Sequence, residues 1–172
     1  GVAAFSRQPS CVGRAPTVLW SIDLTLSSEQ RSSVDPMLTN YGMDTITLAG
    51  PLQARLEAMA NAGFGQVMLN ARDVVGHPGG LDAAVAAVRA SGLRPTGFQV
   101  LRDFEGLPGY LHDYKVDIAK SMLDMCAALE SKVLLVCSST SRHASEEPDR
   151  LAEDLAKLAM LALPLGIKIA YE

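Results

Sequence analysis

Short β-prone runs alternate with amphipathic helices along most of this chain, and this alternation restricts the fold more than any other feature. The helical segments repeat apolar residues every three to four positions, so each would bury one face. The run at 132–137 is apolar throughout, as expected for a parallel strand covered on both sides. The strands are predicted at 45–49, 66–70, 95–100, 132–137 and 167–172, and the helices at about 51–62, 81–90, 113–129 and 148–162. Five strands alternating with four helices predict a parallel α/β sheet.

Glycine stands at the end of three predicted helices, where it is followed by an apolar residue and then by a strand. These joints are Ala62-Gly63-Phe64, Ser91-Gly92-Leu93 and Leu165-Gly166-Ile167. Glycine is the usual helix stop because it adopts the left-handed conformation without steric cost. No GxGxxG motif follows any predicted strand, so the sequence does not support a dinucleotide site.

Composition excludes several classes of function. The 172 residues carry a formal net charge of −4, which argues against binding to a nucleic-acid backbone. No apolar run approaches the roughly 18 residues of a membrane span. The three cysteines, Cys11, Cys126 and Cys137, are widely spaced and lack a CxxC pair. We therefore expect a reduced, cytoplasmic protein in which Cys126 and Cys137 are buried.

The first forty or so residues differ from the rest of the chain. They show no sustained helical or strand period, and only residues 17–22 favour a short strand or apolar anchor. We predict a poorly ordered extension over 1–42 and a single domain over 43–172. Met37 or Met43 would then mark the natural start of the domain.

The last predicted strand ends in Tyr171-Glu172, which places a carboxylate at a strand tip. In a β/α barrel the loops at the carboxyl ends of the strands form the active-site face. Glu172 is therefore a candidate metal ligand or base.

One segment points to a known family. The run Phe98 to Gly106, with its core Arg102-Asp103-Phe104-Glu105-Gly106, resembles the third strand of bacterial 3-dehydroshikimate dehydratases. These enzymes are xylose-isomerase-like barrels of the sugar phosphate isomerase/epimerase superfamily, often fused to a 4-hydroxyphenylpyruvate-dioxygenase-like domain. Three further segments agree in order: residues 50–64, 134–138 and 169–172. The resemblance implies that residues 43–172 form the first five strands of a TIM (β/α)8 barrel.

The resemblance also implies a function for a longer parent protein. That function is metal-dependent dehydration of 3-dehydroshikimate to protocatechuate, in aromatic catabolism. Glu172 matches the first of four ligands to a divalent cation (Mg, Mn or Co), and the other three are expected on later strands. The chain alone is expected to bind no metal tightly, to be inactive, and to self-associate through its open sheet edges. Its partner would be a small hydroxylated keto acid or sugar, and neither a nucleic acid nor a membrane.

Five further residues are candidate substrate contacts. Arg102 would face the barrel mouth and clamp a substrate carboxylate with its guanidinium fork, unless it pairs with Asp103 or Glu105. Gln99 would point either into the barrel or toward the helices. Glu105 would brace Arg102 or cap the following turn. His77 and Ser138 lie in loops after the second and fourth strands, on the expected catalytic face.

Other interpretations stay open at this point. Met68 and Ala71 stand where relatives often carry acidic residues, which favours a different substrate or a non-catalytic, degenerate barrel. A sugar or hydroxypyruvate-type isomerase would use the same metal site. A DNA-repair relative of the endonuclease IV type is disfavoured, because it needs a histidine-rich site and this chain has three scattered histidines.

Overall fold

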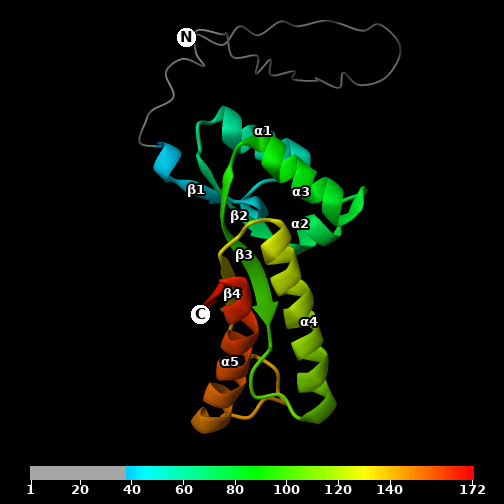
Figure 1. The fold of residues 1–172 in the computed structure, drawn as a ribbon, viewed down its shortest axis with the longest axis vertical. Coiled ribbons are helices and arrows are strands. Elements are labelled where there is room, and N and C mark those ends of the chain that lie inside the picture. The colour runs from blue at the N-terminus through cyan, green and yellow to red at the C-terminus, as the bar shows by residue number, and fades with distance from the viewer. Residues whose placement is uncertain (1–37) are drawn as a thin grey trace, which may run out of the picture. The chain divides into compact units, whose positions relative to one another are not determined.

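The computed structural model describes residues 38–172, so the predicted disorder of residues 1–37 lies outside the part described. The described residues form a parallel sheet with strand order β1-β2-β3-β4-β5. Figure 1 shows the strands linked in chain order through helices. The strands are β1 (Gly42–Asp44), β2 (Gln66–Asn70), β3 (Arg94–Arg102), β4 (Val133–Cys137) and β5 (Lys168–Tyr171). Parallel strands with neighbours in sequence order confirm the predicted N-terminal part of a barrel.

Four long helices connect the strands. They are α1 (Leu52–Asn61), α3 (Gly80–Ser91), α4 (Gly109–Ala128) and α5 (Pro148–Ala162), and a short helix α2 (Ala71–Val75) precedes α3. Pro148 occupies the first turn of α5, where its missing N–H leaves no helical bond unmade. Gly92 ends α3 in the left-handed conformation, with φ of 72°.

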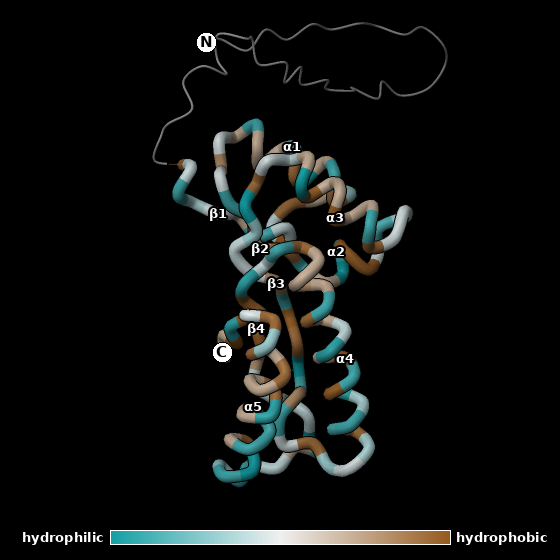
Figure 2. The backbone as a smooth tube through the Cα atoms, viewed as in Figure 1, coloured by the Kyte–Doolittle hydropathy of each residue, from teal (hydrophilic) through white to brown (hydrophobic). Residues whose placement is uncertain are grey.

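The core lies between the sheet and these helices. Alternate strand residues such as Val67, Leu69, Leu134 and Val136 are fully buried against helix residues that include Leu56, Met59, Met122 and Leu158. The predicted burial of Cys126 is confirmed, whereas Cys137 is only half-buried. Met59 and Met122 lie in the core, and Met125 is partly buried against it. Figure 2 shows hydrophobic and hydrophilic colour alternating along α4 and α5, as expected for helices with one buried face.

The first strand was predicted four residues from its place. Residues 45–47 form a 3₁₀ turn, and the strand is Gly42–Asp44. Asp44 explains the difference, because its Oδ1 accepts from the Ile46 N–H at 2.9 Å and its carbonyl accepts from the Thr47 hydroxyl at 2.7 Å. Such local bonds favour a turn over a strand. Residues 38–42, assigned from sequence to the extension, form a 3₁₀ turn at Leu38–Asn40 and the start of β1.

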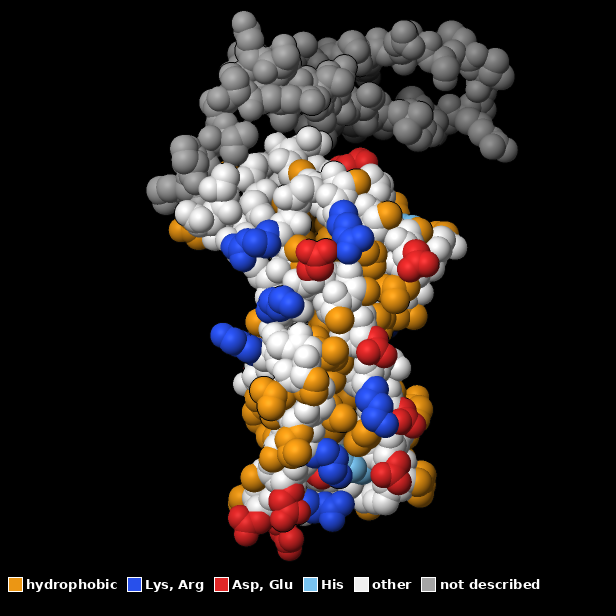
Figure 3. All heavy atoms as spheres, viewed as in Figure 1, with side chains coloured by type: hydrophobic (Ala, Val, Ile, Leu, Met, Phe, Trp, Pro, Cys, Tyr) orange, Lys and Arg blue, Asp and Glu red, His pale blue; other side chains and the backbone are white. Residues whose placement is uncertain are grey.

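The two outer strands of the sheet, β1 and β5, each pair on one side only within the described part of the chain. No helix among residues 38–172 is long and apolar enough to cross a membrane. On the face drawn in Figure 3, acidic and basic side chains are interspersed with hydrophobic ones.

Candidate functional site

A row of three residues crosses the carboxyl ends of β3, β4 and β5. Arg102 pairs with Cys137 in the ladder, and Glu172 lies beside Cys137, because its N–H bonds to the Val136 carbonyl at 2.9 Å and its carbonyl accepts from the Ser138 N–H at 2.7 Å. Neighbours in a parallel ladder project to the same face of the sheet. Leu101 and Val136, one residue earlier, are buried against the helices. The row of Arg102, Cys137 and Glu172 therefore projects to the opposite face, which is the interior of a barrel.

Gln99 also belongs to this inner face. A register shift between Phe98 and Leu101 keeps both of those residues in the core and leaves Gln99 between them. Its amide Nε2 donates to Oδ2 of Asp44, so side chains from β1 and β3 meet across β2. A carboxylate accepts hydrogen bonds, so the amide nitrogen must face Asp44. The Gln99 Oε1 then turns away from Asp44, and it has no hydrogen-bond partner among residues 38–172.

The Arg102 guanidinium has no ion pair or hydrogen bond with any described residue, and the side chain is exposed. Its expected alternative partners are engaged elsewhere. Asp103 accepts from the Thr140 N–H at 2.8 Å, and Glu105 bonds to Ser139 and Tyr171. Pairing of Arg102 with either carboxylate is therefore not observed. The guanidinium lies at the rim of the sheet, and its N–H groups make no hydrogen bond to the described residues.

Glu105 is buried, with 1% of its surface exposed, and this burial favours a structural role over direct contact with a substrate. Its Oε1 accepts from the Ser139 N–H and from the Tyr171 hydroxyl, the latter at 3.0 Å. Partial burial, the hydrogen bond to Glu105 and the negative charge of Glu105 raise the pKa of Tyr171, and a hydrogen bond from Ser138 opposes them. Ser138 thus lies beside the Tyr171 hydroxyl, at the end of β4.

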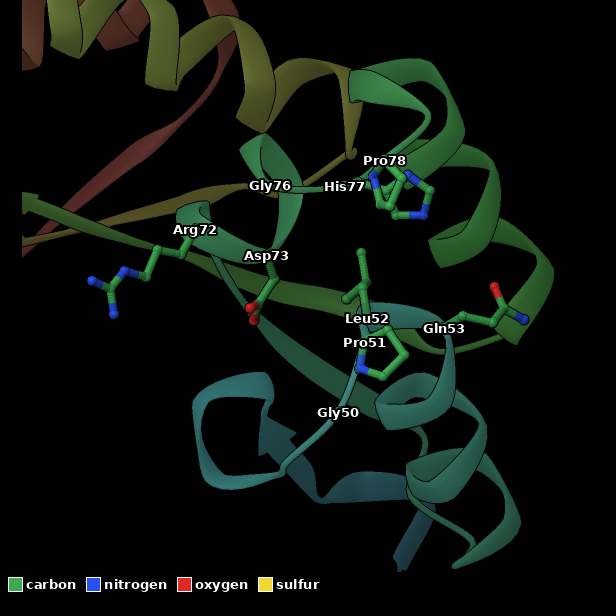
Figure 4. A pocket seen from close by; sticks show the side chains of 9 residues that line it. All are labelled: Gly50, Pro51, Leu52, Gln53, Arg72, Asp73, Gly76, His77 and Pro78. Atoms are coloured by element: carbon green, nitrogen blue, oxygen red, sulfur yellow. The ribbon is translucent and has the colours of Figure 1, made fainter.

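His77 lies apart from these residues. It lines a cavity of about 390 Å³ formed by the start of α1 and the α2–α3 turn, which Figure 4 shows. None of the other predicted site residues lines this cavity. The Nδ1 of His77 accepts from the Gly79 N–H at 3.2 Å, so the imidazole stabilises its own turn. The structure does not bring His77 together with Arg102, Gln99 or Glu172.

The described residues offer a divalent cation one suitable donor at the rim. Glu172 supplies a carboxylate, but residues 38–172 contain no group of three or more His, Cys, Asp or Glu side chains placed to hold an ion. Hard divalent cations take about six oxygen ligands. Glu172 fits as one ligand of such a site, and the described residues do not complete it.

Two parts of this site were not foreseen from the sequence. A strand predicted over 45–49 hides the strand end at Asp44, so the sequence does not mark this carboxylate as part of the site. Glu105 and Tyr171 are 66 residues apart in the sequence, and no local sequence pattern predicts the hydrogen bond between them. A correct position for the first strand would have identified Asp44 as a strand-tip carboxylate.

Comparison with known proteins agrees with this geometry. No family model matches the chain. The chain is 34% identical over 128 residues to a 3-dehydroshikimate dehydratase of Pseudomonas aeruginosa and 32% identical to one of Pseudomonas putida. Each alignment covers 74% of this chain but 20% of the relative, so the chain spans about one fifth of these enzymes' length.

Solved structures agree on the fold. A fusion of a xylose isomerase-like TIM barrel with 4-hydroxyphenylpyruvate dioxygenase superimposes with a TM-score of 0.71 and 31% identity, over 76% of this chain and 21% of that one. A zinc-bound IolI protein superimposes with a TM-score of 0.63 and 18% identity, over 76% of this chain and half of that one. The predicted resemblance is therefore confirmed: the chain is similar to 3-dehydroshikimate dehydratases and folds as part of a xylose isomerase-like TIM barrel.

Proposed function

We propose that the protein carrying this chain is a metal-dependent 3-dehydroshikimate dehydratase that forms protocatechuate. The observation that carries the proposal is the row at the rim, where the unpaired Arg102 guanidinium and the Glu172 carboxylate project to the same face of the sheet. The sequence similarity to two enzymes of that name supports the choice of substrate.

The substrate has two kinds of group that these residues suit. Arg102 would bind the ring carboxylate through two parallel N–H···O bonds, which fix the orientation of the ring. Gln99, with its amide nitrogen held by Asp44, would accept a hydrogen bond from a substrate hydroxyl through Oε1. Both contacts need a ligand that is at once an acid and an alcohol.

Glu172 would be one ligand of a divalent cation, and the remaining ligands would come from outside this chain. A cation bound there would polarise the ketone oxygen and so make the neighbouring carbon more acidic. Loss of a proton from that carbon and of a hydroxyl group from the ring releases one water and leads to the aromatic product. The general base is not among the residues assigned here. We also propose a cytoplasmic location, which the free thiols of Cys126 and Cys137 support.

The test compares substrates on the full-length protein. Purified protein is assayed with 3-dehydroshikimate and with ketoses, each before and after treatment with a chelator and again after Mg²⁺, Mn²⁺ or Co²⁺ is restored. We expect protocatechuate to form, to stop with chelator and to resume with metal. Turnover of ketoses alone would replace the dehydratase proposal by a sugar isomerase, and turnover insensitive to chelator would remove the metal from it.

A further inference from the structure

Glu105 is a buried carboxylate without a cationic partner among the described residues. Residues with this little exposure are rarely Glu, because an ionised carboxylate loses its hydration when buried. No Lys or Arg of the described chain forms an ion pair with it, and its hydrogen bonds come from neutral donors.

One oxygen of Glu105 connects three successive strand ends. Glu105 itself lies in the loop after β3, Ser139 in the loop after β4, and Tyr171 at the end of β5. Both donors, the Ser139 N–H and the Tyr171 hydroxyl, converge on Oε1. The other oxygen, Oε2, is buried and has no partner among residues 38–172. A buried acceptor without a donor lowers stability, because the group has lost its hydration without replacement. The unbonded Oε2 opposes burial of a Glu here, whereas the two bonds to Oε1 tie the strand ends together.

The hydrogen bond from Tyr171 to Glu105 fixes the residue that directly precedes Glu172. Tyr171 precedes Glu172 directly, and the backbone of Glu172 is already bonded to β4 on both sides. The Tyr171 hydroxyl adds a third fixed point, on the helix side of the sheet, because Tyr171 pairs with the buried Val136. Fixing the side chain of residue 171 limits rotation of the strand end, and with it the direction in which Glu172 projects.

We infer that Glu105 is a positioning residue, which holds the Glu172 carboxylate and the loop after β4 in place through Tyr171 and Ser139. The metal-positioning role of Glu105 rests on the proposed function. That Glu105 fixes the end of β5 and the loop after β4 by hydrogen bonds does not depend on that function. In this role Glu105 acts through an oxygen that accepts hydrogen bonds, and its negative charge is not required. Glutamine keeps an acceptor at this position, and methionine keeps only the size of the side chain.

The test compares Glu105→Gln, Glu105→Met and Tyr171→Phe in the protein as its gene encodes it. Glu153→Gln and Tyr110→Phe are matched controls, since both residues are exposed and neither side chain forms a hydrogen bond or ion pair with residues 38–172. The first measurement is Mn²⁺ affinity by calorimetry. We expect Glu105→Met and Tyr171→Phe to weaken it about tenfold to a hundredfold, as changes behind a metal ligand commonly do, and Glu105→Gln to restore most of it. An equal loss in Gln and Met variants would overturn the inference, since charge itself would then matter.

The second measurement is backbone amide exchange, which needs no metal and no activity. In Glu105→Met, the amides of Ser139 and Glu172 should exchange about tenfold faster, while those of β2 stay unchanged. Exchange as slow as in the wild type would overturn the positioning role even if the protein proves to bind no metal. A wild type that binds no Mn²⁺ but shows the faster exchange in the variant would instead remove the proposed metal function and keep the mechanical link.

Discussion

At the scale of single residues, Arg102 and Arg94 stand at opposite ends of the same strand and are both exposed. Only Arg102 lies at the carboxyl end, where the proposed substrate would bind. Its guanidinium makes no bond to the described residues, so replacing it should leave the fold unchanged. This makes Arg94 a matched control for charge and strand position.

We expect Arg102→Lys to lower kcat/KM for 3-dehydroshikimate about tenfold or more, mainly through KM. The cause is that an ammonium group keeps the charge but loses the planar fork that matches a carboxylate. Arg94→Lys should change neither constant, and thermal melting should be the same in both variants. Equal kinetics for Arg102→Lys and wild type would show that the guanidinium does not bind the substrate.

The buried thiol of Cys126 supplies a second prediction, on pH. Burial raises the pKa of Cys126 from 9.0 to about 12, because the thiolate loses hydration in the core. The unfolded chain deprotonates first, so this contribution to stability is complete below pH 9 and is lost as pH rises toward 12. The loss amounts to at most about 4 kcal/mol.

Urea denaturation at neutral pH and at pH near 10.5 tests this. The free energy of unfolding should fall more between these pH values in the wild type than in Cys126→Ala, because the variant has no thiol to titrate. Other groups titrate equally in both proteins, so the difference isolates Cys126. The same slope in both proteins would show that Cys126 is not protected from water.

At the scale of elements, the loop after β3 is held against the start of α5. Gly106 has φ of 76°, its N–H donates to the buried Asp154 at 2.9 Å, and its carbonyl accepts from Ser145 at 2.7 Å. A Cβ at this position would lie 2.8 Å from both the Ser145 carbonyl oxygen and a Leu151 methyl group. The loop can approach α5 this closely only because residue 106 has no side chain.

We expect Gly106→Ala to destabilise the protein by about 2–4 kcal/mol, from left-handed strain plus the steric overlap. Gly92→Ala is the matched control, since φ is 72° there and an added Cβ meets no atom within 4 Å. That variant should cost about 1 kcal/mol, from strain alone. Thermal melting distinguishes them, and equal losses would mean that the loop yields without cost.

The start of the domain gives the next prediction. Residues 38–42 contact the sheet closely: the Gln66 side chain donates to the Asn40 carbonyl at 3.1 Å, and a Cβ on Gly65 would lie 2.2 Å from the Thr39 carbonyl oxygen. Deleting residues 1–42 should therefore lower the melting temperature, because it removes this turn and the first residue of β1. The sequence alone predicts that the whole extension over 1–42 can be deleted without effect on melting. The contacts of residues 38–42 restrict that expectation to residues 1–37, whose deletion should leave melting unchanged. Equal melting of the two deletions would mean that the turn adds no stability.

At the scale of the whole molecule, two edges of the sheet are open within the described part. Near β5, the side chains of Met160 and Leu163 are 73% and 76% exposed, and near β1 Tyr41 and Ile46 are also exposed. Unpaired parallel strands beside exposed apolar side chains favour association.

We expect the 172-residue chain alone to associate in a concentration-dependent way. Sedimentation velocity over a range of concentrations measures this, and a double variant with Met160→Lys and Leu163→Lys should associate less. Val75→Lys is the control, since Val75 is exposed but lies on α2, away from both edges. A stable monomer at every concentration would contradict the prediction.

The order and kind of the elements follow from local features of the sequence. Apolar period, glycine at helix ends and an apolar fourth strand are local signals, and they gave β2 at its observed bounds and β3 to β5 within two residues. The motif from Arg102 to Gly106 could also be recognised from the sequence, because its residues are contiguous. These features depend on residues close together in the chain, so the sequence contains them directly.

Which side chains meet depends instead on how the chain folds in space. Asp44 reaches Gln99 over 55 residues, and Glu105 reaches Tyr171 over 66, because the sheet brings distant strand ends to one rim. The first strand was misplaced for a related reason, since the side chain of Asp44 turns the backbone at a point where β-propensity favours a strand. Contacts of this kind depend on strand register and loop path, and neither follows from local propensity.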